Sequence, residues 1–260
     1  MLRFWTIHRM NLSDRAFHLV APPALREDEV QLWRLDLEAL AVNEDCWQRL
    51  LSVDERARAE RFLLPRPRQH FVVTRGVLRT VLGAYLALDP TKLNFQNSVK
   101  GKPSLGAPNA NTGITFNVSH AGEVALLAFS RRRELGVDVE RVSRDLDIDA
   151  VAQRFFSLHE QRQLASVSSE DRFEAFFRCW TRKEAYIKAK GEGLALPLDQ
   201  FDVSLAVRDT NALLSTRPDG SEAGRWSLRE VSAGPGYLAA LCVAGHDWSL
   251  RCPSSVPEGF

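Results

Sequence analysis

The sequence predicts an α+β protein built from two copies of one structural unit, because three features of the first half return in the same order in the second. Each half has a strand with an acidic position, a serine and glutamate pair that opens a helix, and a continuous apolar run near its end. A repeat of roughly a hundred residues is too long for a solenoid, so we interpret it as a duplication that forms a pseudo-dimer. The expected division is an N-terminal extension at 1–28, a first half at 29–133 and a second half at 134–260.

The strands are predicted from the spacing of apolar residues. Segments 33–37 and 135–139 alternate apolar and polar positions, which suits strands that bury one face. Segments 123–129 and 237–243 are nearly continuous apolar runs, which suit fully buried strands.

The helices are predicted from two capping boxes, in which a serine is followed three residues later by a glutamate. Ser52 with Glu55 and Ser157 with Glu160 fit this pattern, so each serine should cap the start of a helix. A long helix is expected after each box, at about 70–86 and at about 173–190.

The two copies can be aligned on a Thr-Arg dipeptide in each long helix, at 74–75 and at 181–182. In this alignment Asp36 is the counterpart of the acidic residue in the second strand, and Val77 or a neighbour lies where the second half has Glu184. We therefore expect one half to hold a metal and the other a nucleotide, with one active site per chain.

Composition excludes several classes of protein. The chain has 34 basic and 33 acidic side chains and a net charge of +1, so charge gives no overall attraction to nucleic acid or a membrane. No segment resembles a signal peptide or a membrane span. The four cysteines lack metal-ligand spacing, so reduced thiols and a cytoplasmic location are expected, without structural zinc.

Two segments carry candidate chemistry. In the strand Gly136–Glu140, Asp138 and Glu140 point to one face, where two carboxylates repel each other and need a cation. Magnesium with oxygen ligands is the usual solution. In the later helix, Glu184 and Lys188 are four residues apart and share a face, which places an acid for a metal beside a base for a phosphate. The pair of segments indicates magnesium-assisted chemistry on a phosphate ester or anhydride.

These segments also carry a resemblance to a known family. Gly-Val-Asp-Val-Glu at 136–140 and Trp-Thr-Arg-Lys-Glu-Ala-Tyr-Ile-Lys-Ala-Lys-Gly at 180–191 resemble the signature pair of the 4′-phosphopantetheinyl transferases of the fused Sfp type. Gly-Lys-Pro at 101–103 and Phe-Asn-Val-Ser-His at 116–120 match two further motifs of that family, in the family's order. Each motif alone is a weak signal, but the four together are specific.

The resemblance implies a fold and a reaction. The fold would be the pseudo-dimer, with coenzyme A and Mg²⁺ in the cleft between its halves, and the chain would be a monomer. The activity would be that of a holo-[acyl-carrier-protein] synthase, which transfers 4′-phosphopantetheine from coenzyme A to a serine of an apo acyl or peptidyl carrier protein. The product that leaves would be 3′,5′-ADP.

The resemblance also assigns roles to residues of this chain. Asp138, Glu140 and Glu184 would bind Mg²⁺, and Glu184 would take the proton of the carrier serine, directly or through a water. Lys188 would contact phosphate and keep Glu184 ionised. The alternative for Lys188 is an ordinary helix-surface pair with Glu184, worth a few tenths of a kcal/mol.

The nucleotide contacts are assigned in the same way. His120 and Ser119 would bind phosphate, and Lys102 would approach the nucleotide phosphates. Arginine suits the 3′-phosphate because its planar group donates two hydrogen bonds to one phosphate, and Arg75 is our choice because it lies on the helix that mirrors the one with Glu184. Trp180 is expected to pack beneath the metal site. The other histidines are interpreted as structural.

Two alternatives remain. The first is another magnesium enzyme that cleaves a pyrophosphate, such as a nucleotide hydrolase, which would use the same carboxylates with water as the acceptor. The second is a module that binds coenzyme A or a carrier protein without catalysis. The sequence does not indicate whether the carrier belongs to fatty-acid, polyketide or nonribosomal peptide synthesis.

Overall fold

The computed structural model describes residues 23–253 with the exception of 208. The predicted N-terminal extension at 1–28 therefore lies largely outside the described residues. Its last part belongs to the body of the protein, since Leu25 is buried in the apolar core of the first half and Gln31 donates to the carbonyl of Pro23.

The first half begins with a strand, continues through four helices and ends in four strands. Its elements are β1 (Glu29–Asp36), α1 (Leu37–Ala41), α2 (Glu44–Leu50), α3 (Val53–Glu60), α4 (Pro65–Leu86), β2 (Phe95–Asn97), β3 (Pro103–Leu105), β4 (Ile114–Ala121) and β5 (Val124–Arg131), with short 3₁₀ turns at Pro90–Lys92 and Asn109–Thr112.

The second half follows the same plan with three helices. Its elements are β6 (Leu135–Arg141), α5 (Ile148–Phe155), α6 (Leu158–Ser166), α7 (Arg172–Lys190), β7 (Phe201–Val203), β8 (Leu213–Thr216), β9 (Trp226–Val231), β10 (Tyr237–Ala244) and β11 (Ser249–Arg251), with 3₁₀ turns at Gly193–Ala195, Leu198–Gln200 and Gly220–Arg225.

The strands form two main sheets whose internal order is the same. One sheet has the order β11-β1-β5-β4, and the other has the order β6-β10-β9. In both, the first strand of the half (β1 or β6) lies beside its last long strand (β5 or β10). The strand that precedes the last long strand in sequence (β4 or β9) lies on the other side of it. The short strand β11 leaves the second half and pairs in parallel with β1. The predicted α+β class is confirmed, and the halves are joined through this strand as well as through the chain between them.

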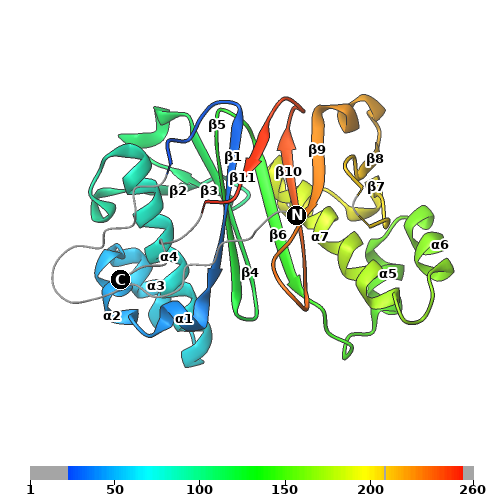
Figure 1. The fold of residues 1–260 in the computed structure, drawn as a ribbon, viewed down its shortest axis with the longest axis horizontal. Coiled ribbons are helices and arrows are strands. Elements are labelled where there is room, and N and C mark those ends of the chain that lie inside the picture. Colours follow the sequence, from blue (N-terminus) through cyan, green and yellow to red (C-terminus); the bar gives the residue numbers. More distant parts are fainter. Residues whose placement is uncertain (1–22, 208, 254–260) are drawn as a thin grey trace.

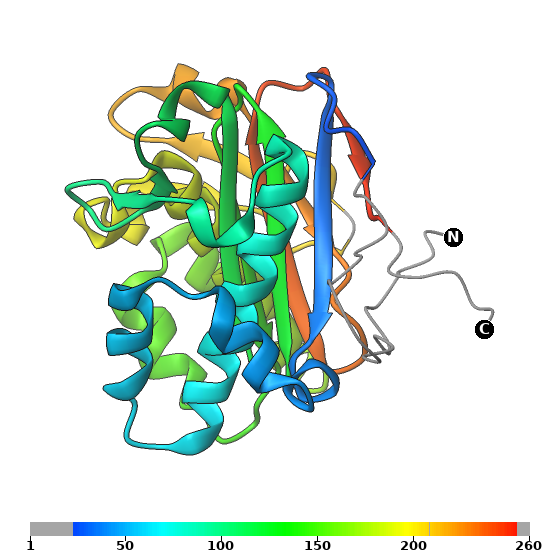
Figure 2. The same ribbon diagram turned by 90° about the vertical axis from the view of Figure 1, so that its left-hand side faces the viewer.

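The sheets and helices are arranged in four layers (Figure 1). Helices α1–α4 cover one sheet and α5–α7 cover the other, with the two sheets adjacent at the centre (Figures 1 and 2). Three apolar clusters fill the spaces, one under each helix layer and a third between the sheets. Strand β5 shows the consequence, because Leu127 faces the helical core while Leu126 faces the other sheet. The prediction of buried strands from continuous apolar runs is therefore confirmed.

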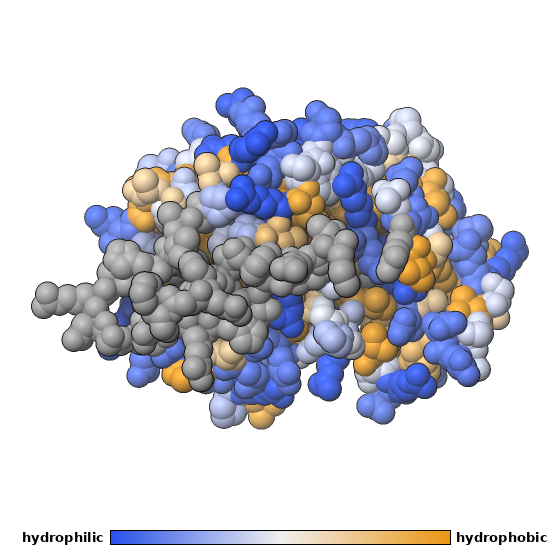
Figure 3. All heavy atoms as spheres, viewed as in Figure 1, coloured by the Kyte–Doolittle hydropathy of each residue, from blue (hydrophilic) through white to orange (hydrophobic). Residues whose placement is uncertain are grey.

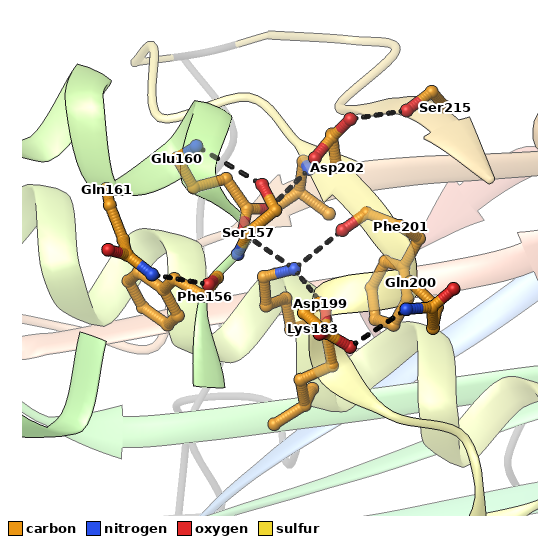
Figure 4. A network of polar contacts seen from close by, with 12 residues as sticks. Phe156, Ser157, Glu160, Gln161, Lys183, Asp199, Gln200, Phe201, Asp202 and Ser215 are labelled. Carbon is orange, nitrogen blue, oxygen red and sulfur yellow. Dashed lines mark hydrogen bonds and ion pairs between the residues drawn. The ribbon is translucent and has the colours of Figure 1, made fainter. Parts of the chain in front are cut away.

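Both predicted capping boxes are present, and each glutamate also binds a cation of the following long helix. Ser52 and Glu55 cap α3, and Ser157 and Glu160 cap α6. Glu55 accepts a hydrogen bond from Arg79 at 2.6 Å. In the second half the two boxed residues lie beside Lys183, whose Nζ is 2.8 Å from the Glu160 carboxylate (Figure 4). Each cation also donates to two backbone carbonyls that follow its helix, at Pro90 and Leu93 or at Leu198 and Phe201.

This correspondence changes the alignment of the two halves. Matching Arg79 with Lys183 places Thr80, rather than Val77, opposite Glu184. The Thr-Arg dipeptides do not occupy equivalent places, because they stand at different distances from the matched cations. Asp36 also differs from its expected counterpart in the second strand, since its carboxylate accepts from Ala39 N and caps α1.

The long helices match their predicted positions with one extension. Helix α7 has the predicted bounds to within one residue, and Gly191 ends it in a left-handed conformation with φ of 69°. Helix α4 begins five residues earlier than predicted. Its first turn contains Pro65 and Pro67, where the missing N–H groups leave no helical bond unmade.

Two further observations concern the surface and the thiols. All four cysteines are free. Within the described part of the chain, no helix has the length and apolar character needed to cross a membrane. On the face shown in Figure 3, the described surface is mostly polar, with apolar residues in small groups.

Candidate active site

Residues of three of the four motifs line a cleft between the first half and helix α7 of the second half. The cleft has a volume of about 290 Å³. It is lined by the loop 100–103, by Asn117 and Val118 of β4, and by Glu184 and Lys188 of α7 together with Ile187, Gly191 and Gly193.

Asp138 is the most buried of the candidate ligands, with 3% of its surface exposed. Its Oδ1 accepts hydrogen bonds from Ser119 Oγ at 2.8 Å and from Lys188 Nζ at 2.5 Å. Its Oδ2 is buried and has no hydrogen-bond partner among the described residues. Burial raises the pKa of Asp138, although the charge of Lys188 and the hydrogen bond from Ser119 oppose the rise. One oxygen of this carboxylate is thus available to a further ligand.

Glu140 and Glu184 complete an acidic group around Asp138. Burial and the charge of Asp138 raise the pKa of Glu140 to about 7, and a hydrogen bond with Trp180 opposes the rise. Burial and the same charge also raise the pKa of Glu184. The three carboxylates are close enough to repel one another, as the alternating strand and the helix motif predicted.

The side chains of Asp138, Glu140 and Glu184 are of the type that binds a hard divalent cation. All the donor atoms are carboxylate oxygens, one of them unpaired and buried, and the repulsion among them would be relieved by a cation. Among the residues that the structure describes, no group of three His, Cys, Asp or Glu side chains is already arranged to hold a metal ion. In the structure, positive charge at Asp138 comes from Lys188.

The ion-pair partner of Lys188 differs from both interpretations of its spacing, which placed it against a phosphate or in a surface pair with Glu184. Its ion pair is with Asp138 on β6, at 2.5 Å, and its Nζ also donates to Ser119 Oγ at 3.0 Å. It therefore bridges the halves of the molecule, whereas an ordinary surface pair would join it to Glu184 on its own helix. Its charge acts on the pKa of Glu184 in the predicted direction, but burial and the charge of Asp138 outweigh it and the pKa of Glu184 is raised.

Ser119 and His120 lie at the end of β4 that faces this group. Ser119 is buried and bonded to Asp138, Lys188 and the backbone N of Val139. His120 reaches the surface. Its partial desolvation, together with the charges of His70 and Lys188, lowers its pKa. Ser119 is therefore beside Asp138, and His120 lies near enough to Lys188 for that charge to affect its pKa.

Two predicted nucleotide contacts already have partners in the protein. Arg75 lies 3.2 Å from Glu55 and stacks over Phe95 at 5.0 Å, with 15% of its side chain exposed. Lys102 lies in the cleft wall, but its Nζ donates to the carbonyl oxygens of Leu135 and Ala189 at 3.0 Å each. Burial lowers the pKa of Lys102.

Sequence reasoning missed one residue that the structure places at the site. Asn117 was part of a motif but had no role, and its Oδ1 accepts from Val137 N at 2.9 Å. His70, which was interpreted as structural, is buried and contacts Glu38 at 3.1 Å. The signal for Asn117 was its spacing from Ser119, because residues two apart on a strand share a face.

The comparisons with known proteins agree with this geometry. The model of the 4′-phosphopantetheinyl transferase superfamily matches residues 134–242, and the model of the 4′-phosphopantetheinyl transferase N-terminal region matches residues 42–132. The two matches divide the chain close to the boundary between β5 and β6 and together cover most of it.

Individual relatives extend the match over nearly the whole chain. The 4′-phosphopantetheinyl transferase HetI of Nostoc sp. is 39% identical over 235 residues, which cover 90% of this chain and 96% of the relative. The Sfp enzyme of Bacillus subtilis is 29% identical over 199 residues, with 76% and 84% covered. The human L-aminoadipate-semialdehyde dehydrogenase-phosphopantetheinyl transferase is 25% identical over 218 residues, with 77% and 69% covered.

The protein is thus an enzyme of the transferase class. It belongs to the 4′-phosphopantetheinyl transferase superfamily and is similar to its Sfp-type members, as its four motifs predicted.

Proposed function

We propose that this enzyme transfers 4′-phosphopantetheine from coenzyme A to a serine of an apo acyl or peptidyl carrier protein, with Mg²⁺, and releases 3′,5′-ADP. The observation that carries the proposal is Asp138, a buried carboxylate with one unpaired oxygen, bridged to Lys188 and Ser119 at a cleft between the two halves. The ammonium of Lys188, the hydroxyl of Ser119 and a cation held by Asp138 would together offset the negative charge of a pyrophosphate.

The metal would be held by Asp138, Glu140 and Glu184. When bound, Mg²⁺ supplies positive charge to the pyrophosphate oxygens and so favours departure of the nucleotide. The chain's own contribution is a set of carboxylates whose raised pKa values reflect burial and mutual repulsion, which a cation relieves.

Lys188 and Ser119 would act on the phosphates directly. The ammonium of Lys188 would pair with a phosphate oxygen as well as with Asp138. Its side chain is 29% exposed and lines the cleft. Ser119 offers a hydroxyl beside the same ammonium. His120 is exposed near the end of β4, where a ring nitrogen can donate to a phosphate.

Glu184 would take the proton of the carrier serine, directly or through a water. Its raised pKa makes it a stronger base than an exposed glutamate, and it lines the cleft that the serine must enter.

For the 3′-phosphate we favour His120 over Arg75. The charge of Arg75 is already shared with Glu55 and two aromatic rings. His120 is exposed at the end of β4.

We further infer that the two halves arose by duplication and that one chain forms one active site as a monomer. The identical strand order, the paired capping boxes and the paired buried cations support this. Ser119 and His120 come from the first half and the carboxylates from the second, so a single chain supplies every proposed group. Four free cysteines support a cytoplasmic location.

The test is to incubate the enzyme with Mg²⁺, coenzyme A and apo carrier domains of different pathways, and to weigh each carrier by intact-protein mass spectrometry. We expect a gain of one phosphopantetheine group that needs Mg²⁺ and is lost in Glu184→Gln. Hydrolysis of coenzyme A with no modified carrier would favour the pyrophosphate-cleaving alternative. Binding without turnover would favour the non-catalytic one, which the complete set of acidic residues argues against.

A further inference from the structure

The free edge of β6 is completed by side chains from the first half. Strand β6 pairs with β10 along one edge only. Along the other, Lys102 donates to Leu135 O, Asn117 accepts from Val137 N and Ser119 accepts from Val139 N, at 3.0, 2.9 and 3.3 Å. The three β6 positions alternate, as the backbone groups of one strand edge do. Side chains thus take the place of a paired strand and leave the cleft open beside them.

Lys102 differs from the other two because it also binds the end of α7. Its Nζ donates to Ala189 O at 3.0 Å. This carbonyl belongs to the last turn of the helix, whose oxygens have no partner within the helix, and a cation there also complements the helix dipole. The lysine stem runs over the helix end, since a Cβ on Gly191 would lie 3.2 Å from Lys102 Cδ.

The two elements that Lys102 joins carry the proposed chemistry. Strand β6 holds Asp138 and Glu140, and α7 holds Glu184 and Lys188. They touch at Gly136, where a Cβ would lie 2.3 Å from Ala185 O. Lys102 bonds to the residue before Gly136 and to a residue in the adjacent turn of α7. It therefore fixes the contact between strand and helix from the side of the first half.

We propose that Lys102 is a positioning residue, which ties the first half to β6 and α7 and so sets the distances among the catalytic carboxylates and Lys188. Two of its three N–H groups are used by backbone carbonyls. Lys100 offers the contrast, because it lines the same cleft, is exposed and has no hydrogen-bond or ion-pair partner among the described residues. Lys100 is the lysine of this loop that is free to meet a phosphate.

The kinetic test, which rests on the proposed function, compares three lysine variants. Lys102→Met should lower kcat by about ten- to a hundredfold, as loss of a supporting contact does, with KM for coenzyme A changed by less than about threefold. Lys100→Met should raise that KM with little change in kcat. Lys92→Met, at an exposed turn, is the matched control and should change neither. Lys102→Arg, which keeps a cationic donor, should recover part of kcat.

The opposite kinetic pattern would overturn the proposal. If Lys102→Met raises KM for coenzyme A tenfold or more and leaves kcat unchanged, Lys102 binds the nucleotide and not the helix. If Lys102→Met does not fold, Lys102→Gln, which retains a donor, enters the same assays with the same criteria.

A second measurement keeps this inference separate from the proposed function. Hydrogen exchange without ligands should be faster in Lys102→Met than in the parent or Lys100→Met, in the peptide 186–193 and along β6. Unchanged exchange there would refute the positioning role, whatever the enzyme transfers. Faster exchange in an enzyme that modifies no carrier would retain the positioning role and reject the reaction.

Discussion

The two long helices, α4 and α7, are built alike around a buried ion pair but differ on the face that carries chemistry. In each, a cation binds a capping-box glutamate and two carbonyls, through Arg79 in α4 and Lys183 in α7. At the next position, the Thr80 hydroxyl donates to Gly76 O within its own helix, whereas Glu184 lines the cleft. The same frame thus supports a helix with an internal hydrogen bond at this position in one half and a helix with a carboxylate in the cleft in the other, where we propose that the reaction occurs.

The second half contains both kinds of ion pair, and the hydrogen bonds distinguish them. Glu160 and Lys183 are fully buried, and both oxygens of the glutamate are satisfied, by Lys183, Ser157 N and Val203 N. Asp138 pairs with Lys188, yet one of its oxygens has no partner in the described structure. A complete pair stabilises the fold, and an incomplete one in a cleft is available for a ligand.

The largest effect on kcat should come from replacing Glu184, which lies beside the ion pair of Asp138 and Lys188. Glu184→Gln keeps the shape of the side chain but removes a metal ligand and a base, so kcat should fall by about 10²–10⁴. The unfolding midpoint should not fall, because repulsion between Glu184 and Asp138 is also removed. Carrier mass spectrometry and thermal unfolding measure the two quantities. Normal turnover in this variant would reject the assignment of Glu184.

The structural pair should behave in the opposite way. Lys183→Met leaves the buried Glu160 without a cation, which should lower the free energy of unfolding by about 3–5 kcal/mol. Urea unfolding measures this. Lys190→Met is the matched control on the same helix, since Lys190 pairs with Glu222 near the surface, and its loss should cost at most about 1 kcal/mol. Equal effects in the two variants would show that burial does not distinguish these pairs.

The three carboxylates Asp138, Glu140 and Glu184 should make the free energy of unfolding depend on both pH and Mg²⁺. A carboxyl whose pKa is raised to about 7, as in Glu140, binds a proton more tightly in the folded state than in the unfolded one. Its contribution to stability is therefore present at low pH and lost as pH rises from the unfolded value through about 7. Mg²⁺ must displace that proton, so it should stabilise the fold more at pH 8 than at pH 6.

Thermal unfolding with and without Mg²⁺ at the two pH values tests this. At a concentration a hundred times its Kd, the metal should add about 2.7 kcal/mol at pH 8. Glu140→Gln should raise the metal-free midpoint at pH 8 and reduce the Mg²⁺ effect. A Mg²⁺ effect of equal size at both pH values would mean that Glu140 is not among the groups that the metal deprotonates.

The comparison of the halves also shows what the sequence could predict. The capping boxes and the apolar strands follow from local spacing, whereas the ion pair of Lys188 with Asp138 on β6 was not predicted. The pairing of Arg75 with Glu55 and the carbonyl contacts of Lys102 depend on partners that the fold brings from distant segments. A positive side chain near a phosphate motif looks the same in sequence whether its charge is free or already used.

The smallest expected effect tests the contact that holds the reactive helix against β6. In Gly136→Ala, the new Cβ would lie 2.3 Å from both Ala185 O and Ala189 N, which are backbone atoms of α7 and cannot rotate away. The helix must therefore shift, at a cost of about 1–3 kcal/mol in unfolding free energy. Gly220→Ala is the control, because a Cβ there meets nothing within 4 Å. If the shift moves Glu184 and Lys188 away from Asp138, kcat should fall by more than the loss of folded enzyme explains. An unchanged kcat in the destabilised variant would mean that the cleft tolerates movement of α7, and that the distances between helix and strand are not what limits the reaction.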